Sequence, residues 1–349
     1  MPIECKSPVK LLRPSCMGPI LAMPMALGER LDLLGSDLAG ALGAAARALS
    51  RFQVVGKLLP PREAVMVELD QAIAVIGARA AARPAVLVDD KKGRFATYDR
   101  AFSVSRTNDA PAGLVHGLLV GTKALLVQLG HSNGLTLGAH KELVAGLATA
   151  IAGLSAEAAV LPSFEKLYDA TSLPPADPMG RWVDGHHALF AMCQVAEYHF
   201  YRLKGAEKVG DFETARNSLA AAASAFNFIG YAFALAGDVS EPDYRVIVDH
   251  MLAVDPNFSG LWFADHREAK DLARGLLKGC PLRLGTSNLA SFALAFHFAS
   301  SSHTFVCGEM DGSDRSSLLM GGELSGVSGV ESLRQFAQVG LKGIGAKVE

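Results

Sequence analysis

The chain has 349 residues, half of them hydrophobic, and its 33 basic and 35 acidic side chains give a net charge of −2. This length is sufficient to bury a large hydrophobic core. Because the charges are balanced, and because no basic stripe with interleaved aromatic residues occurs, the sequence argues against a nucleic-acid partner.

Signals of export and of membrane insertion are not found either. No unbroken apolar stretch precedes Pro19, and no segment reaches about 18 apolar residues without a charge or a proline. We therefore expect a cytoplasmic protein with no membrane partner. The cysteines are scattered and form neither a CxxC nor a CxxCH motif, which argues against a zinc knuckle, a redox dithiol and the usual c-type haem attachment (Cys5, Cys16, Cys193, Cys280 and Cys307).

In chain order, residues 1–25 are rich in proline and predict an N-terminal arm that packs over another surface or subunit. A helical pattern follows in 28–55, and Pro61 then restarts a helix that continues to about residue 83. Two β-prone runs within 84–100 flank a turn-like segment at 90–93 and predict a small β-hairpin. Two further helices are expected at 111–130 and 139–154.

The second half of the chain has an almost entirely helical pattern. A loop is predicted at 162–181, and its proline-rich part at 174–180 is the best candidate for a half-domain boundary. Helices are expected at 184–205, 211–237, 242–254, 266–279 and 286–310, followed by a Gly/Ser-rich loop at 312–329 and a last helix at 330–339. We therefore predict a mainly all-α fold, a helical bundle forming a single domain over 26–349, with one small β-hairpin.

Among these helices, 286–310 carries the most distinctive chemistry. Its His303 and Cys307 are four residues apart, so they share one face of the helix about one turn from each other. Ala299 and Ser300 on the same face are small and leave room for a flat ligand. This arrangement suits a haem, with His303 bound to the iron and Cys307 at the porphyrin edge. The alternative is that both are ordinary buried side chains.

The segment HTFVCGEMDGS begins at His303, and a later segment, SGVESLR, ends at Arg334. Met310, Gly312 and Ser313 stand where the C-terminal signature of tryptophan 2,3-dioxygenases has an M-x-G-S stretch after its haem-ligating histidine, and the pattern is similar to that signature. The loop that follows is longer here and lacks the TGGSSG core of those dioxygenases. The H-x-x-x-C spacing resembles one branch of these haem-dependent aromatic oxygenases, the 3-methyl-L-tyrosine hydroxylases of saframycin-type antibiotic biosynthesis.

This resemblance implies a helical haem-binding fold, in which Cys307 forms one thioether to the porphyrin and a second, upstream histidine completes a bis-His iron site. We expect His266 to be that histidine, because it lies on a different segment from His303 and can face it across a flat cofactor. His266 is also the candidate acid/base for breaking an O–O bond. His297 lies on the same helix as His303 and points elsewhere, and His250 is the second choice.

The resemblance also implies a reaction, the hydroxylation of 3-methyl-L-tyrosine to 3-hydroxy-5-methyl-L-tyrosine with hydrogen peroxide, or with dioxygen and a reductant. For the carboxylate of this amino acid Arg202 is the first candidate, before Arg245 and Arg267. The alternatives are an L-tyrosine 3-hydroxylase, an indole-ring dioxygenase, and a non-enzymatic helical haem-binding or scaffold protein. A homo-oligomer is a candidate assembly. Phenylalanines of the second half are expected to surround the substrate ring (Phe200, Phe226, Phe228 and Phe233).

Overall fold

The structure, a computed structural model, confirms that the protein is mainly α-helical. It describes residues 18–24, 27, 36–54, 62–89, 94–129, 131, 135, 137–154, 177–256, 258, 263–279 and 282–311, of which 50–54, 62–65, 137, 282 and 304–311 are described by their backbone alone. These residues contain ten α-helices, one short 3-10 helix and one small sheet. The predicted loop at 312–329, the predicted helix at 330–339 and residues 1–17 of the predicted arm lie outside them.

The helices expected in the first half are present, as α1 (Ser36–Val54), α2 (Arg62–Ala81), α4 (Ala110–Leu129) and α5 (Leu137–Leu154). By length and composition alone, α4 and α7 (Phe212–Ala236) could cross a membrane. However, 89% of the apolar window of α4 and 67% of that of α7 are buried inside the protein. Their apolar sequences are therefore explained by their place in the core.

The β structure differs from the predicted hairpin. Strands β1 (Ile20–Ala22), β2 (Pro84–Ala85) and β3 (Ser105–Thr107) form one sheet in the order β1-β3-β2, with β1 parallel and β2 antiparallel to β3. The predicted second strand of the hairpin is wrong, because helix α3 (Phe95–Ala101) occupies that segment. The Asp89 carboxylate accepts hydrogen bonds from the backbone N–H groups of Ala96 and Thr97, at 2.7 and 3.2 Å, and so stabilises the start of α3. The predicted turn at 90–93 lies outside the described residues.

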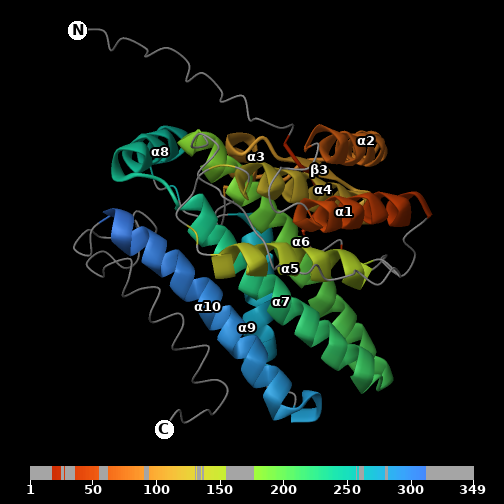
Figure 1. Cartoon of the computed structure of the whole chain (residues 1–349). Coiled ribbons are helices and arrows are strands. Elements are labelled where there is room, and N and C mark those ends of the chain that lie inside the picture. The colour runs from red at the N-terminus through yellow and green to blue at the C-terminus, as the bar shows by residue number, and fades with distance from the viewer. Residues whose placement is uncertain are drawn as a thin grey trace, which may run out of the picture.

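The second half consists of α6 (Pro178–Val209), α7, α8 (Glu241–Val254), α9 (Ala264–Gly279), the 3-10 helix η4 (Leu282–Leu284) and α10 (Thr286–Asp311). α6 begins earlier than predicted, because Asp177 caps it by accepting the N–H of Gly180 at 3.0 Å and Pro178 occupies its first turn. In Figure 1, α1, α2 and α4 lie at one end of the molecule, and the long helices α6, α7, α9 and α10 extend away from them.

Two close helix contacts hold these long helices in place. A Cβ on Gly121 of α4 would lie 3.0 Å from Cα of Ala188, so α6 packs directly on α4. A Cβ on Gly230 of α7 would lie 2.5 Å from the Phe298 ring and 3.3 Å from Cα of Ala299, so α10 packs as closely on α7. One hydrophobic core includes residues on both sides of the proposed boundary at 174–180. The division into an arm and one helical domain remains a prediction.

Candidate active site

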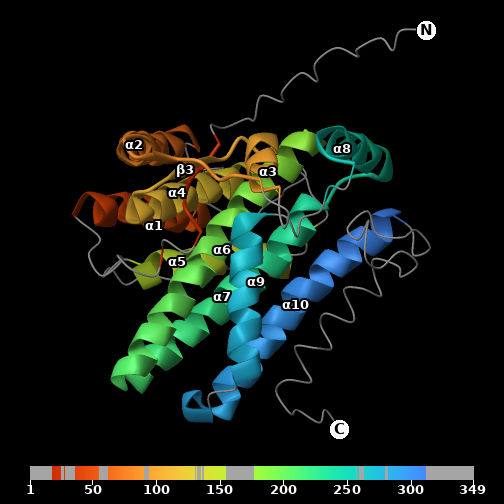
Figure 2. The ribbon, with the colours of Figure 1, turned by 180° about the vertical axis from the view of Figure 1, so that it is seen from behind.

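The structure brings His303 and His266 together around one phenylalanine. His303 lies on α10, His266 in the first turn of α9, and Phe233 near the end of α7. The ring centroid of Phe233 is 4.7 Å from that of His303 and 6.0 Å from that of His266. Figure 2, seen from behind, shows α9 and α10 side by side in front of α7. Two histidines from separate helices therefore share one apolar neighbour.

The surroundings of His303 keep its imidazole neutral. Burial, followed by repulsion from His266, Lys270 and His186 when these groups are protonated, lowers the pKa of His303 to about 3. The residue as a whole is half-buried. At neutral pH the ring is uncharged and one nitrogen carries a lone pair, which is the form that binds a metal.

His186 of α6 is a neighbour that the sequence did not single out. Its Nδ1 lies 2.7 Å from the carbonyl oxygen of Trp182, so Nδ1 carries the proton and donates it, which leaves Nε2 as the acceptor. The ring packs against those of Trp182 and Phe102, with centroids 4.8 Å away in each case. Burial lowers the pKa of His186 to about 4. The adjacent His187 faces elsewhere, with Nε2 2.7 Å from the carbonyl oxygen of Phe102.

Lys270 is a second residue that sequence reasoning missed. It follows His266 by four residues on α9, so the two side chains lie on the same face of that helix. Burial and the positive charge of Arg274 lower the pKa of Lys270 to about 7. The i, i+4 spacing from His266 was the available signal. Together with its effect on His303, this spacing places Lys270 at the two histidines.

The three arginines proposed for the substrate carboxylate lie in different places. Arg202 sits near the end of α6, where its charge acts on His199 and on Asp211. It is 16 residues from His186, which corresponds to about 24 Å along the helix axis. Its chain neighbour Tyr201 donates a hydrogen bond to Glu268 of α9, two residues after His266, at 2.8 Å, so this end of α6 packs against α9. The role of Arg202 at the substrate carboxylate stays a prediction. The other two have their own partners: Arg245 pairs with Glu241 at 2.5 Å, and the Arg267 guanidinium lies over the Phe95 ring at 5.9 Å.

His250, the second choice for an iron ligand, lies on α8. Its ring is 6.4 Å from that of Trp182, and its buried Nε2 has no hydrogen-bond partner. Phe263, which immediately follows the undescribed Trp262, packs against Phe190 at 4.2 Å in the same aromatic cluster. Phe263 therefore contributes to the core between α6 and α9.

Of the phenylalanines expected around a substrate ring, only Phe233 contacts His303 or His266. Phe226 packs against Phe200, Phe292 and Phe296, and Phe228 packs beside Gly146 of α5. These side chains build the core between α5, α6, α7 and α10. The alternation of apolar residues along the sequence does not show which of them face the histidines.

The helical spacing expected for His303 and Cys307 is present, because α10 continues to Asp311. The side chain of Cys307 lies outside the described part of the chain, as do Gly312, Ser313 and the segment 325–334. The expectation that Ala299 offers open space is wrong, because Ala299 is buried in the contact with Gly230 of α7. The hydroxyl of Ser300 donates to the carbonyl oxygen of Phe296 at 3.0 Å and is thus satisfied within the helix.

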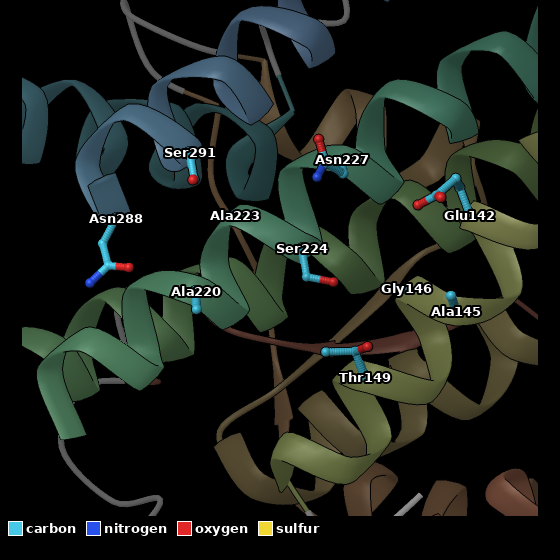
Figure 3. A pocket seen from close by; sticks show the side chains of 10 residues that line it. All are labelled: Glu142, Ala145, Gly146, Thr149, Ala220, Ala223, Ser224, Asn227, Asn288 and Ser291. Carbon is cyan, nitrogen blue, oxygen red and sulfur yellow. The ribbon is translucent and has the colours of Figure 1, made fainter. Parts of the chain in front are cut away.

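A separate hollow of about 400 Å³ lies between α5, α7 and α10 (Figure 3). On α7 it is lined by Asn227, six residues before Phe233, which places the two side chains about 120° apart around the helix. None of the predicted site residues lines this hollow, so it is distinct from the histidine pair. Its lining is small and polar (Glu142, Ala145, Gly146, Thr149, Ala220, Ala223, Ser224, Asn227, Asn288 and Ser291).

Comparisons with known proteins point to one family. The sequence profile described as SfmD 3-methyl-L-tyrosine peroxygenase matches residues 28–300, a range that includes His266 and ends before His303. A 3-methyl-L-tyrosine peroxygenase of Streptomyces lavendulae is 27% identical over 257 residues, which is 70% of each chain. A crystal structure of reduced SfmD, soaked with sodium hydrosulfite, shares the fold with a TM-score of 0.56 at 23% identity, over 84% of this chain and 98% of that one.

Proposed function

This chain belongs to the family of SfmD 3-methyl-L-tyrosine peroxygenases, and from that premise we propose that it is a haem-dependent oxidoreductase that hydroxylates 3-methyl-L-tyrosine with hydrogen peroxide. The product is 3-hydroxy-5-methyl-L-tyrosine: one peroxide oxygen enters a ring C–H bond, and the other leaves as water. The observation that carries the proposal is the meeting of His303 and His266, from separate helices, at Phe233.

The residues present fit a haem. The imidazole of His303 is neutral at neutral pH. The second imidazole, that of His266, comes from another helix, and the apolar ring of Phe233 lies beside both imidazoles. We assign His303 and His266 as the two iron ligands and Cys307 as the thioether partner of the porphyrin. When bound, haem supplies the activation of peroxide. Acid–acetone extraction tests the thioether: haem should stay with the wild-type polypeptide and leave the Cys307→Ala variant, and free haem from the wild type would contradict it.

In this proposal His266 has two tasks. As a ligand it would hold the haem together with His303. When its nitrogen is not bound to iron, the ring can take a proton from peroxide and return it to the departing oxygen. His266 lies at the start of α9, between partly exposed residues of that helix and the apolar ring of Phe233. This position suits a group that takes up and returns a proton.

The substrate carboxylate needs a cation, and among the described residues Lys270 is a cation whose charge acts on His303. It shares a face of α9 with His266, and its charge acts on His303. Since Lys270 is withdrawn from water, pairing with a carboxylate would offset the cost of burying its charge. We therefore assign the substrate carboxylate to Lys270 in preference to Arg202.

Matched variants distinguish these two cations. Lys270→Met should raise KM for 3-methyl-L-tyrosine about tenfold or more, which corresponds to about 1.4 kcal/mol or more, and should leave turnover of the decarboxylated amine much less affected. Arg202→Met should change neither. The reverse pattern would return the role to Arg202.

The reaction itself is tested with peroxide labelled with ¹⁸O on both atoms and mass spectrometry of the product. One labelled oxygen per hydroxylated ring is expected. A pocket that recognises one extra methyl group discriminates by roughly 10–200-fold at most, so L-tyrosine should react more slowly and L-tryptophan poorly. Conversion of L-tryptophan to N-formylkynurenine as the preferred reaction would contradict the proposal and favour an indole-ring dioxygenase.

A further inference from the structure

A buried charge cluster lies directly behind His266. Its centre is Arg106 of β3, whose side chain is almost fully enclosed at 4% exposure. The guanidinium forms two parallel hydrogen bonds to Asp99 of α3, from Nε and Nη2, both at 2.8 Å. It forms two more to Asp265 of α9, from Nη1 at 2.9 Å and from Nη2 at 2.8 Å. Arg106 therefore holds two carboxylates from two helices at once.

Every N–H group of this guanidinium has a partner. The fifth, on Nη1, donates to the carbonyl oxygen of Ala22 in β1 at 3.1 Å. Gln194 of α6 extends the cluster, because its Nε2 donates to the same carbonyl oxygen at 3.0 Å and to Asp265 Oδ1 at 2.8 Å. The cluster thus connects β1, β3, α3, α6 and α9 through directional bonds in the interior.

Stability alone does not account for this arrangement. Burying two carboxylates against one guanidinium carries a large desolvation cost, and well-packed apolar residues of similar size hold a core together at least as well. Paired hydrogen bonds between a guanidinium and a carboxylate also fix the position and orientation of the two groups relative to each other. Asp265 is fully buried and lies in the first turn of α9, immediately before His266. Fixing Asp265 fixes where the first turn of α9 sits and which way His266 points.

We propose that Arg106 and Asp265 are positioning residues that hold His266 toward His303, an inference that rests on the proposed function for its effect on the haem. Asp99 provides the matched control. It receives two hydrogen bonds from the same guanidinium, as Asp265 does, but it belongs to α3, which carries no site residue. Substitution of either aspartate should lower the stability of the protein, whereas only substitution of Asp265 should change the position of His266.

The experiment compares Asp265→Asn with Asp99→Asn by two readouts on the full chain. The first is amide hydrogen exchange of 264–268, which does not depend on bound haem. Because a charge-assisted bond to the first turn of α9 is lost, Asp265→Asn should speed this exchange about tenfold or more, and Asp99→Asn should leave it near the wild-type rate. The second is the spin state of the haem iron, which should shift from low toward high spin in Asp265→Asn alone.

Equal exchange rates and equal spectra in the two variants would overturn the inference. If Asp265→Asn does not fold, Gln194→Met replaces it: this variant removes one bond to Asp265 and keeps the charges, and it should shift both readouts in the same direction. A wild type without a low-spin haem spectrum would refute the proposed iron site, and the exchange readout would still decide whether the cluster positions α9.

Discussion

Replacing Phe233 with alanine separates the packing of the core from the construction of the site. The Phe233 side chain is 8% exposed and contacts both histidines. Phe226, seven residues earlier on the same helix, is 3% exposed, and its ring packs against three other phenylalanines of the core. The two residues therefore form a matched pair with different neighbours.

Both substitutions remove a buried ring and leave a cavity, at a cost of about 3–5 kcal/mol in the free energy of unfolding. Because Phe233 lies at the edge of the core, we expect Phe233→Ala near 3 kcal/mol and Phe226→Ala nearer to 4–5 kcal/mol. Urea unfolding followed by far-ultraviolet circular dichroism measures both values. A loss of this size is a large part of the stability of a typical protein, so each variant is measured well below its unfolding temperature.

The site should respond in the opposite order. Without the Phe233 ring, His303 and His266 lose their shared neighbour. The haem spectrum of Phe233→Ala should therefore show a larger share of high-spin iron, and turnover should fall at least about tenfold. Phe226→Ala, although more destabilised, should retain the wild-type spectrum and most of its turnover. If the spectral change follows the loss of stability in both variants, the histidine site is not organised by Phe233.

The remaining predictions concern two buried titratable groups to which no role in the reaction is assigned. Glu197 is fully buried with no partner for either carboxylate oxygen, and burial, followed by the charges of Asp265 and Glu268, raises its pKa well above the ordinary value. The folded state therefore holds a proton that the unfolded state releases, so the free energy of unfolding falls as pH rises above about 4.5. The Glu197→Gln variant should lose this pH dependence and should be more stable than the wild type at pH 8. Equal slopes of unfolding free energy against pH in the two proteins would contradict this reasoning. His116 accepts the N–H of Ile20 through Nδ1 at 2.9 Å, and burial lowers its pKa to about 4. Its contribution is complete above about pH 6.5 and is lost as pH falls to about 4, by roughly 3 kcal/mol; His116→Asn, which can keep the acceptor, should flatten the acid side of the stability curve, and an unchanged curve would count against it.

The sequence predicted most helices because their signals are local. The apolar run of α4 between its proline and Gly130, and Gly237 at the end of α7, are features of near neighbours in the chain, whereas α6 continues four residues beyond its predicted end at 205. The hairpin at 84–100 failed for a local reason as well, since the capping oxygen of Asp89 outweighed the β-propensity of the residues that follow.

The candidate site was only partly predictable, because it depends on which helix faces meet. The motif around His303 and the separate position of His266 could be recognised from the sequence. The spacing of Lys270 from His266 shows that the two share a face of α9, but the nearness of Lys270 and His186 to His303 results from the packing of α9 and α6 against α10 and α7 and cannot be read from the sequence. Arg202, chosen for its aromatic neighbours in the sequence, follows Tyr201, which donates a hydrogen bond to Glu268 of α9, and its role stays a prediction.

The visible absorption spectrum of the purified protein and of its His266→Ala variant tests the central claim most directly. The account predicts a Soret band and a low-spin, six-coordinate haem in the wild type. His266→Ala should keep the haem and become high-spin, while His303→Ala should lose it. A wild type with no Soret band would contradict the proposed haem site. A His266→Ala variant that stays low-spin would contradict the assignment of the second iron ligand, and His250 would be the next histidine to test.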